Sequence, residues 1–383
     1  MNGAEADRAA IGVHDIGLNV VRNEAGEIGF RVLVGGGLGR TPIVGSQICE
    51  FLPWQHLLTY LDAILRVYNR YGRRDNKYKA RIKILVKALT PEVFAEKVTA
   101  EWAHTKDGPA TLTQQELDRV AGHFSAPAYE QFSGDDADYL AKREAEKGFN
   151  NWALRNVHAH KVPGYAAVTL SLKPTAVAPG DADDKQLDAI ADLADQFSFG
   201  ELRVTHQQNL VLADVRQSDL YALWQACRKH GFATPNIGLL TDIICCPGGD
   251  FCALANAKSI PIAEAIQRTF DDLDYLHDIG DLDLNISGCM NACGHHHVGH
   301  IGVLGVDKKG QEFYQVSIGG NSGRDASIGQ ILGPSFSAED MPSVMTKVID
   351  VYIENRTPEE QFLDTFKRIG MAPFKERVYA AAN

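Results

Sequence analysis

Four cysteines in two close pairs are the residues of this chain whose types and spacing point most directly to chemistry. Five residues separate Cys246 from Cys252, three separate Cys289 from Cys293, and thirty-six lie between the pairs. Four thiolates in such pairs can bind a zinc ion or an iron–sulfur cluster. A cluster is favoured because a five-residue spacing is unusual for structural zinc and because residues 247–249, Pro-Gly-Gly, allow a tight loop with exposed N–H groups. Spacing alone leaves zinc, or no metal at all, open.

The other cysteines and the neighbouring histidines are weaker candidates. Cys49 and Cys227 stand alone in apolar surroundings, which predicts packed core thiols. Cys245 lies one residue before the first pair, and we expect it to be a spectator that binds no metal. Residues 295–297 are consecutive histidines, and His300 follows. Three consecutive side chains cannot all face one metal from a regular element, so we expect a polar wall beside a cofactor or a partly exposed loop.

A basic segment interrupts the acidic average of the chain. Residues 70–87 hold eight Lys or Arg and one acid. Such a segment is either a solvated helix face or a wall that binds anions. Arg81 and Lys83 are two residues apart, so in an extended segment both would point to one side. They are therefore the best pair for gripping one small anion.

Composition places the chain among ordinary globular proteins. Its 383 residues suggest two or three domains, at roughly 100–200 residues each. The sequence has no apolar run of the roughly 18–20 residues that a membrane span needs, and its first twenty residues do not read as a signal peptide. A net charge of −11 argues against broad nucleic-acid binding and favours a cytoplasmic protein. Seven cysteines favour reduced thiols or ligands over a disulfide framework.

An internal repeat organises the elements that must position these residues. Residues 29–40 match residues 313–324 at a constant offset of 284, and the register continues into two helical patterns, 56–70 and 341–356. The matching pairs are Val32 and Val316, Gly35 and Gly319, Gly36 and Gly320, Gly39 and Gly323, Arg40 and Arg324, Val67 and Val351, and Tyr68 and Tyr352. We infer a duplicated unit of strand, glycine-rich turn and helix. Almost nothing precedes the first copy, so an upstream piece is expected to be missing.

Between the repeats, the patterns predict a small α+β unit. Residues 165–172 alternate like a half-buried strand, 183–197 have helical spacing with an acidic start, and 200–215 read as two short strands. Residues 218–231 predict a helix with Ser218 as its N-cap and Gly231 past its end. The expected domains are 1–104, the C-terminal part of a first module; 105–150, a linker; 151–233, the α+β unit; 234–356, a second module with the cysteines; and 357–383, a tail forming a surface helix.

Taken together, these motifs resemble the sirohaem-dependent sulfite and nitrite reductase family, and most of all the haemoprotein subunit of assimilatory sulfite reductases. The resemblance rests on the cysteine spacing with "SGCMNAC", the glycine turns "LVGGGLG" and "GGNSG", the strand pair "LRVTHQQNLVL" and the basic "KARIK". It covers residues 12–370. It implies an α+β fold, in which a ferredoxin-like half-domain accompanies duplicated sirohaem and iron–sulfur α/β modules related by a pseudo-twofold repeat. It also implies that about the first third of a complete family member is absent.

The resemblance assigns roles to individual residues. Cys246, Cys252, Cys289 and Cys293 would bind a [4Fe–4S] cluster, and the sulfur of Cys293 would also bridge to the sirohaem iron. Asn291 with Gly35, Gly36 and Gly37 would line the sirohaem and its carboxylates, while Arg81 and Lys83 would hold sulfite or nitrite. Two departures stand out: His300 occupies the place of a usual acidic residue, and further substrate-binding arginines belong to the absent upstream part.

The implied activity is the six-electron reduction of sulfite to sulfide, with nitrite reduction to ammonia as the alternative. A non-catalytic module stabilised by zinc or a cluster is the alternative of another class, and the Arg81/Lys83 pair argues against it. "GGGLG" is not a G-x-G-x-x-G fingerprint, so electrons are expected from a partner, either an NADPH flavoprotein or a ferredoxin. Residues 70–79 offer a basic patch where an acidic ferredoxin could dock.

Overall fold

The computed structural model describes residues 1–380. The chain divides into two compact units. The first comprises residues 1–126 with the short segment 321–328, and the second comprises the rest of the described chain. No helix in the described part combines the length and the apolar character needed to cross a bilayer.

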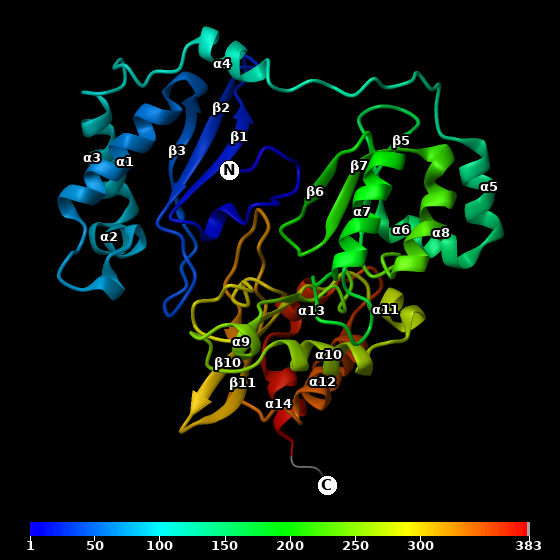
Figure 1. Ribbon diagram of the computed structural model, residues 1–383. Coiled ribbons are helices and arrows are strands. Elements are labelled where there is room, and N and C mark those ends of the chain that lie inside the picture. The colour runs from blue at the N-terminus through cyan, green and yellow to red at the C-terminus, as the bar shows by residue number, and fades with distance from the viewer. Residues whose placement is uncertain (381–383) are drawn as a thin grey trace. The chain divides into compact units, whose positions relative to one another are not determined.

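The first unit is built on a three-stranded antiparallel sheet in the order β1-β2-β3. The strands are β1 (Ile16–Arg22), β2 (Ile28–Val34) and β3 (Ser46–Pro53). The helices are α1 (Leu57–Tyr71), α2 (Ile82–Leu89), α3 (Pro91–Trp102) and α4 (Gln114–Ala121), with short 3-10 turns η1 (Ile11–Val13), η2 (Trp54–His56) and η3 (Lys77–Lys79). Helices α1, α2 and α3 pack together beside the sheet (Figure 1).

Helical spacing of apolar residues explains this packing. On α1, Tyr60, Ala63, Ile64 and Val67 recur at intervals of three or four residues, so they share one face and all are buried. They meet the inward side chains of the sheet in a single core that also takes in α2 and α3. This shared core fixes the sheet relative to the helices. It thereby fixes the turns at the ends of the strands and the start of α2.

The second unit begins with a four-stranded antiparallel sheet in the order β4-β5-β7-β6. Its strands are β4 (Val157–Ala159), β5 (Tyr165–Leu170), β6 (Leu202–Val204) and β7 (Leu210–Arg216). Its helices are α5 (Ala137–Ala145), α6 (Lys147–Asn156), α7 (Asp184–Phe197) and α8 (Leu220–His230), with the turn η4 (Gln217–Asp219). The predicted strand, helix, two strands and helix are confirmed, and Asp183 closes a capping box at the start of α7.

The remainder of the second unit is a five-stranded sheet in the order β12-β11-β10-β9-β8. Its strands are β8 (Ile244–Cys245), β9 (Leu284–Ser287), β10 (Ile301–Lys308), β11 (Gln311–Ile318) and β12 (Gln330–Ile331). Its helices are α9 (Gly248–Phe251), α10 (Ile260–Thr269), α11 (Leu273–Ile279), α12 (Met341–Asn355), α13 (Phe362–Ile369) and α14 (Ala372–Tyr379). Strands β8, β9 and β10 run parallel to one another, and β10, β11 and β12 run antiparallel.

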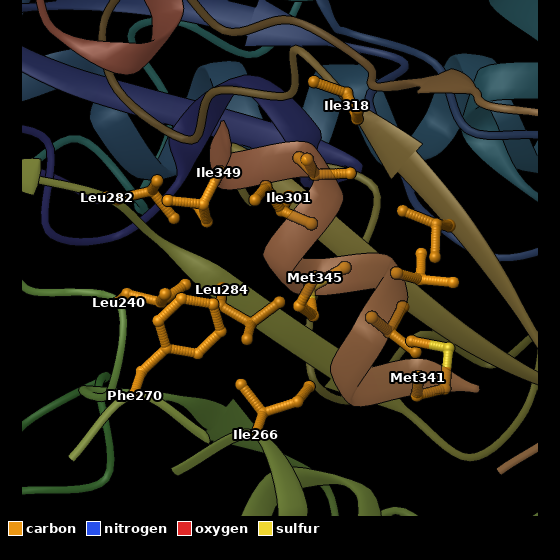
Figure 2. Packing of buried hydrophobic residues seen from close by; sticks show 14 of the residues in the cluster. Leu240, Ile266, Phe270, Leu282, Leu284, Ile301, Ile318, Met341, Met345 and Ile349 are labelled. Carbon is orange, nitrogen blue, oxygen red and sulfur yellow. The ribbon is translucent and has the colours of Figure 1, made fainter. Parts of the chain in front are cut away.

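The core of this part lies between the sheet and its helices. Figure 2 shows Met341, Met345 and Ile349 of α12 directed toward Leu284 of β9 and Ile301 of β10. These side chains are all at most 1% exposed. Each fully buried side chain of this size contributes about 1.5–3 kcal/mol relative to an exposed one, so the core fixes β9 and β10 firmly.

The structure shows the repeat and extends it. Helices α1 and α12 begin and end at equivalent residues, because 57–71 plus 284 gives 341–355. Gly35 and Gly319 have matching left-handed φ angles of 77° and 88°. Strands β1 and β10 also correspond, but at an offset of 285, since the hairpin that follows β10 is one residue shorter. The predicted α+β fold with a duplicated module is confirmed.

Two local predictions are wrong. Ser218 is not the N-cap of a helix; a 3-10 turn precedes α8, whose N-cap residue Asp219 makes no side-chain capping bond. The tail is not one surface helix. Gly370, at φ 71°, separates α13 from α14, and the side chains of Phe362 and Phe374 on these helices are fully buried. Within the segment predicted as a linker, α5 and the start of α6 pack on the half-domain through Tyr139 and Phe149.

Candidate functional site

The two cysteine pairs follow the ends of two neighbouring parallel strands. Cys246 comes directly after β8, and Cys289 comes two residues after β9. Strands β8 and β9 pair in parallel through Cys245 and Ile286. Because carboxyl ends of parallel strands meet at one edge of a sheet, residues far apart in sequence are brought to the same edge. The topology therefore places both pairs together.

The first pair is held by a short helix between the strand and the second cysteine. The N–H of Cys246 donates to the Ile286 carbonyl at 3.1 Å, which continues the pairing of the two strands. The N–H of Cys252 donates to the Gly248 carbonyl at 2.9 Å across α9. The N–H of Gly288 donates to Sγ of Cys246 at 3.1 Å. A backbone N–H aimed at a ligand sulfur is the kind of contact that stabilises a thiolate.

The second pair is held in a tight turn. Ala292 has a left-handed φ of 58°, and its N–H donates to the Cys289 carbonyl at 3.2 Å. The N–H of Gly294 donates to Oγ of Ser287 at 3.1 Å, which ties the end of the turn to the end of β9. Cys289 is buried, whereas Cys293 is exposed. The turn thus presents one sulfur inside the protein and one at its surface.

The surroundings of Cys293 shift the pKa of its thiol. Burial is the main cause that raises the pKa of Cys293, and the charges of Cys246, Cys289 and Cys252 raise it further. Mutual repulsion of four thiolates is relieved by a cationic metal centre. Within residues 1–380, no three Cys, His, Asp or Glu side chains converge closely enough to ligate a single ion. A donor set of four thiols suits either a zinc ion or an iron–sulfur cluster.

Three further residues of the second module lie next to these cysteines in the sequence or within a few residues of them. Asn291 is exposed on the turn between Cys289 and Cys293. His296 is buried, and among the described residues neither of its ring nitrogens has a hydrogen-bond partner. Burial lowers the pKa of His296 to about 3, so the ring is neutral near pH 7. Cys245 is buried, which suits a spectator, and burial raises its pKa.

The glycine turn of the first unit is closely packed against its own backbone. The N–H of Gly35 donates to the Asp15 carbonyl and that of Gly37 to the Ile43 carbonyl, both at 2.9 Å. A Cβ at Gly36 would lie 2.6 Å from the carbonyl oxygens of residues 12 and 14. Two of the three N–H groups predicted to face sirohaem carboxylates are therefore used within the protein.

Arg81 and Lys83 converge on this glycine turn. A Cβ at Gly37 would lie 2.7 Å from Nη2 of Arg81 and 3.1 Å from Cδ of Lys83. Nε and Nη2 of Arg81 donate to the two carboxylate oxygens of Asp15, at 3.1 and 2.7 Å. Both partners are about 41% exposed, so the guanidinium stays accessible to a ligand.

Lys83 is buried beneath the same turn. Its Nζ donates to the carbonyls of Leu38 at 2.8 Å and Thr41 at 2.7 Å, and lies 3.5 Å from that of Gly37. Burial, followed by repulsion from Arg81, lowers the pKa of Lys83. The ammonium of Lys83 thus stabilises the glycine turn by binding its backbone carbonyls.

The predicted extended conformation of this pair is wrong. Helix α2 begins at Ile82, so Arg81 is its N-cap and Lys83 lies in its first turn. The two side chains approach one another because both reach the same glycine turn. Sequence reasoning missed Asp15, which orients Arg81. The structure shows its counterpart in the other repeat, since Asp15 and His300 are the carbonyl partners of Gly35 and Gly319.

Comparison with known protein families agrees with these features. The model of the nitrite and sulphite reductase 4Fe-4S domain matches residues 1–106 and 239–383. The model of the nitrite/sulfite reductase ferredoxin-like half domain matches residues 151–230. These enzymes use sirohaem together with a [4Fe–4S] cluster.

Similar curated proteins include both nitrite and sulfite reductases. The assimilatory ferredoxin-dependent nitrite reductase of Haloferax mediterranei is 26% identical, over 91% of this chain and 57% of its own length. The chloroplastic ferredoxin–nitrite reductase of Betula pendula is 26% identical, over 86% of this chain and 51% of its own. Sulfite reductase [ferredoxin] 1 of Mycolicibacterium paratuberculosis is 24% identical, over 91% of this chain and 58% of its own. The chain thus spans just over half the length of these relatives.

A solved structure shares the fold. The Mycobacterium tuberculosis NirA protein aligns with a TM-score of 0.70 at 22% identity, over 96% of this chain and 62% of the solved chain. The two family models together cover most of the sequence, and the first alone covers about two thirds of it. The chain belongs to the nitrite and sulphite reductase family.

Proposed function

We propose that this chain carries the sirohaem and [4Fe–4S] part of an enzyme that reduces a small oxyanion by six electrons, with sulfite reduced to sulfide. The observation that carries the proposal is the meeting of two cysteine pairs at the ends of β8 and β9. Cys246, Cys252, Cys289 and Cys293 would hold the cluster, and the exposed Cys293 would also hold the sirohaem. When bound, the two groups would supply electrons in sequence to one anion.

The chain's own residues would bind and orient that anion. Arg81 is fixed by Asp15 through two of its five N–H donors, and within residues 1–380 the others have no partner. A guanidinium offers a planar fork that matches an oxyanion. Direct contact between Lys83 and the anion stays a prediction, since its ammonium already binds loop carbonyls. We propose Asn291 and Gly35 to Gly37 as sirohaem contacts.

Nitrite is the second candidate substrate. It is supported by the relatives from Haloferax mediterranei and Betula pendula, which are named as nitrite reductases. Sulfite stands first because, within the family that its motifs resemble, the chain is most similar to the haemoprotein of assimilatory sulfite reductases. The test is anaerobic turnover with a chemically reduced viologen and either anion, with sulfide and ammonium measured as products. A higher kcat/KM for sulfite supports the proposal, and a higher value for nitrite replaces it with the second candidate.

Ferredoxin is the proposed electron donor. The relatives from all three organisms are named as ferredoxin-dependent. Around η3, Arg74, Lys77 and Lys79 are exposed, and Tyr78 beside them is 81% exposed. Exposed cations around an aromatic side chain suit an acidic protein surface. An NADPH flavoprotein is the alternative donor.

A further inference from the structure

The side-chain amide of Gln208 makes both hydrogen bonds that a neighbouring strand would make to Cys245. Nε2 of Gln208 donates to the Cys245 carbonyl at 2.8 Å, and the Cys245 N–H donates to Oε1 of Gln208 at 2.7 Å. Cys245 is the last residue of β8, which forms one edge of the five-stranded sheet. Its other side pairs with Ile286 of β9. Gln208 therefore closes the edge of the sheet one residue before Cys246.

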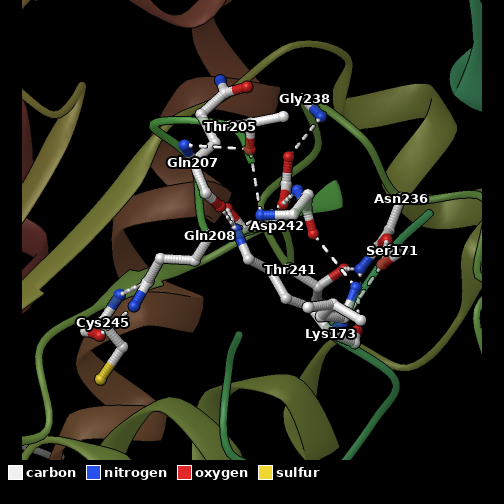
Figure 3. A network of polar contacts seen from close by, with 12 residues as sticks. Ser171, Lys173, Thr205, Gln207, Gln208, Asn236, Gly238, Thr241, Asp242 and Cys245 are labelled. Carbon is white, nitrogen blue, oxygen red and sulfur yellow. Dashed lines mark hydrogen bonds and ion pairs between the residues drawn. The ribbon is translucent and has the colours of Figure 1, made fainter. Parts of the chain in front are cut away.

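The turn that carries Gln208 is itself locked in place. Gln208 has a left-handed φ of 58° between β6 and β7 of the half-domain. Oγ1 of Thr205 accepts from the N–H groups of Gln207 at 3.3 Å and Asn209 at 3.0 Å. Nζ of Lys173 donates to the Gln207 carbonyl at 2.5 Å. Figure 3 shows this turn with Gln208 directed toward Cys245.

A buried ion pair joins the same turn to the chain that enters β8. Nζ of Lys173 lies 2.6 Å from Oδ1 of Asp242, and their side chains are 0% and 3% exposed. Nδ2 of Asn209 donates to the same oxygen at 3.0 Å. Oδ2 of Asp242 accepts from the N–H of Gly238 at 3.0 Å, so both carboxylate oxygens are satisfied. The half-domain thus binds the segment that leads into β8 at two points, Asp242 and Cys245.

We propose that Gln208 is a positioning residue for the [4Fe–4S] cluster. By closing the edge of β8, it fixes the backbone from which Cys246 projects, and the ferredoxin-like half-domain thereby sets the position of the first cysteine pair. The inference rests on the proposed role of Cys246 as a cluster ligand. Gln208 acts through the backbone of Cys245 and does not touch the reacting atoms.

Two variants separate the hydrogen bonds of Gln208 from its bulk. Gln208→Met removes both bonds to Cys245 and keeps the length of the side chain. Gln208→Glu keeps an acceptor for the Cys245 N–H and loses the donor. Gln207→Met is the matched control, because it leaves the Gln207 carbonyl, the acceptor for Lys173, in place. Lys173 and Asp242 are poor probes, since removing one partner of a buried ion pair threatens folding.

Two readouts test the proposal, the first on metal-free protein. Hydrogen exchange followed by mass spectrometry, with overlapping peptides across 243–247, is expected to show at least tenfold faster exchange of the Cys245 amide in Gln208→Met. After anaerobic reconstitution with iron and sulfide, the same variant is expected to lose its cluster several-fold faster to a chelator and to shift its reduced-state EPR spectrum. Gln208→Glu is expected to lie between Gln208→Met and wild type, and Gln207→Met to match wild type.

The outcomes distinguish the inference from the function on which it rests. Unchanged exchange at Cys245 in a folded Gln208→Met protein overturns the inference. So does faster exchange with unchanged cluster loss and spectrum, because the contact would then not position the cluster. If Gln208→Met fails to fold, the same comparisons are made with Gln208→Glu. A wild-type chain that takes up no cluster overturns both the inference and the proposed function.

Discussion

Arg81 and Asp15 form a two-bond ion pair in the first unit, with distances of 3.1 and 2.7 Å. Asp15 corresponds to His300 in the other repeat, since both residues accept the N–H of a left-handed glycine through their carbonyls at 2.9 Å. His300 lies near a carboxylate as well, with Nε2 3.7 Å from Oδ2 of Asp283. The duplicated backbone therefore presents an aspartate that orients a guanidinium in one copy and a histidine in the other.

Replacing Arg81 by Lys tests whether the oriented guanidinium binds the anion. Lysine keeps the charge and loses the planar fork, so we expect sulfite or nitrite to bind roughly tenfold more weakly, about 1.4 kcal/mol. The pair with Asp15 is part exposed, so global stability is expected to change by less than about 1 kcal/mol. Anion titration of the visible spectrum measures the affinity. Arg31→Lys, at an exposed position on β2, is the control, and equal affinities would remove Arg81 from the anion site.

Replacing Lys83 by Met removes the ammonium that holds the glycine turn. The carbonyls of Leu38 and Thr41 lose their donor, which costs about 1–3 kcal/mol in the free energy of unfolding. We expect sirohaem content and anion affinity to fall together, because the turn that we propose as the binding site for both loosens. Denaturant titration and pigment content measure these effects. Weaker anion binding at full pigment content would instead place Lys83 on the anion.

Replacing His296 by Leu tests the cost of a buried histidine. Its pKa of about 3 lies below the usual 6.5, so the unfolded chain takes up a proton in a range where the folded chain does not. The stability associated with this group is complete above pH 6.5 and is lost as the pH falls toward 3. At pH 5 the loss is about 2 kcal/mol. We expect His296→Leu to flatten this acid dependence of the free energy of unfolding, while His123→Leu, at an exposed position, leaves it unchanged. An unchanged slope in His296→Leu would show that the ring is hydrated.

Two adjacent cysteines provide a matched pair for the cluster assignment. Cys246→Ser is expected to lose most of the bound iron and labile sulfide, because it removes a proposed ligand. Cys245→Ser is expected to retain them, because the Cys245 side chain is buried and its Sγ donates to the Cys246 carbonyl at 3.3 Å. Iron and sulfide analysis after reconstitution gives the result. The reverse pattern would shift the ligand set by one residue.

Charge reversal around η3 tests the proposed ferredoxin surface. Arg73 already pairs with Asp75, so Arg74 and Lys77 are the better probes. Arg74→Glu combined with Lys77→Glu is expected to raise the KM for ferredoxin at least tenfold at low salt while viologen-driven turnover is unchanged. Lys185→Glu with Lys229→Glu, an equal charge change at exposed positions of the half-domain, is the control. Equal effects of both pairs would indicate net charge and not a docking site.

The repeated module was predictable because its register is local and gapless. The offset of 284 aligns the glycine turn and all of α1 with α12, since strand, turn and helix follow each other without insertion. The preceding strand escaped notice because one residue is missing from a hairpin. Asp15 and His300 also share no side-chain chemistry, so no similarity marked them as equivalent.

The contacts that complete each site could not be predicted from the sequence as readily as the repeat. A basic alternation such as Arg81-Ile82-Lys83 suits a strand or the start of a helix, and burial of Ile82, Leu85 and Val86 on one face decides for the helix. Gln208 meets Cys245 across thirty-seven residues, through tertiary packing that no local pattern encodes. The two cysteine pairs could be picked out from residue type and spacing alone, and their role as cluster ligands stays a prediction.

The most direct test of the central claim is the metal and pigment content of the anaerobically purified chain. Iron, labile sulfide and zinc are measured alongside the visible spectrum, before and after reconstitution. Bound iron with equal labile sulfide and a sirohaem-type spectrum is the predicted result, since four cysteines meet at the ends of β8 and β9. Stoichiometric zinc without colour, or a colourless protein that takes up no iron and sulfide, would contradict it.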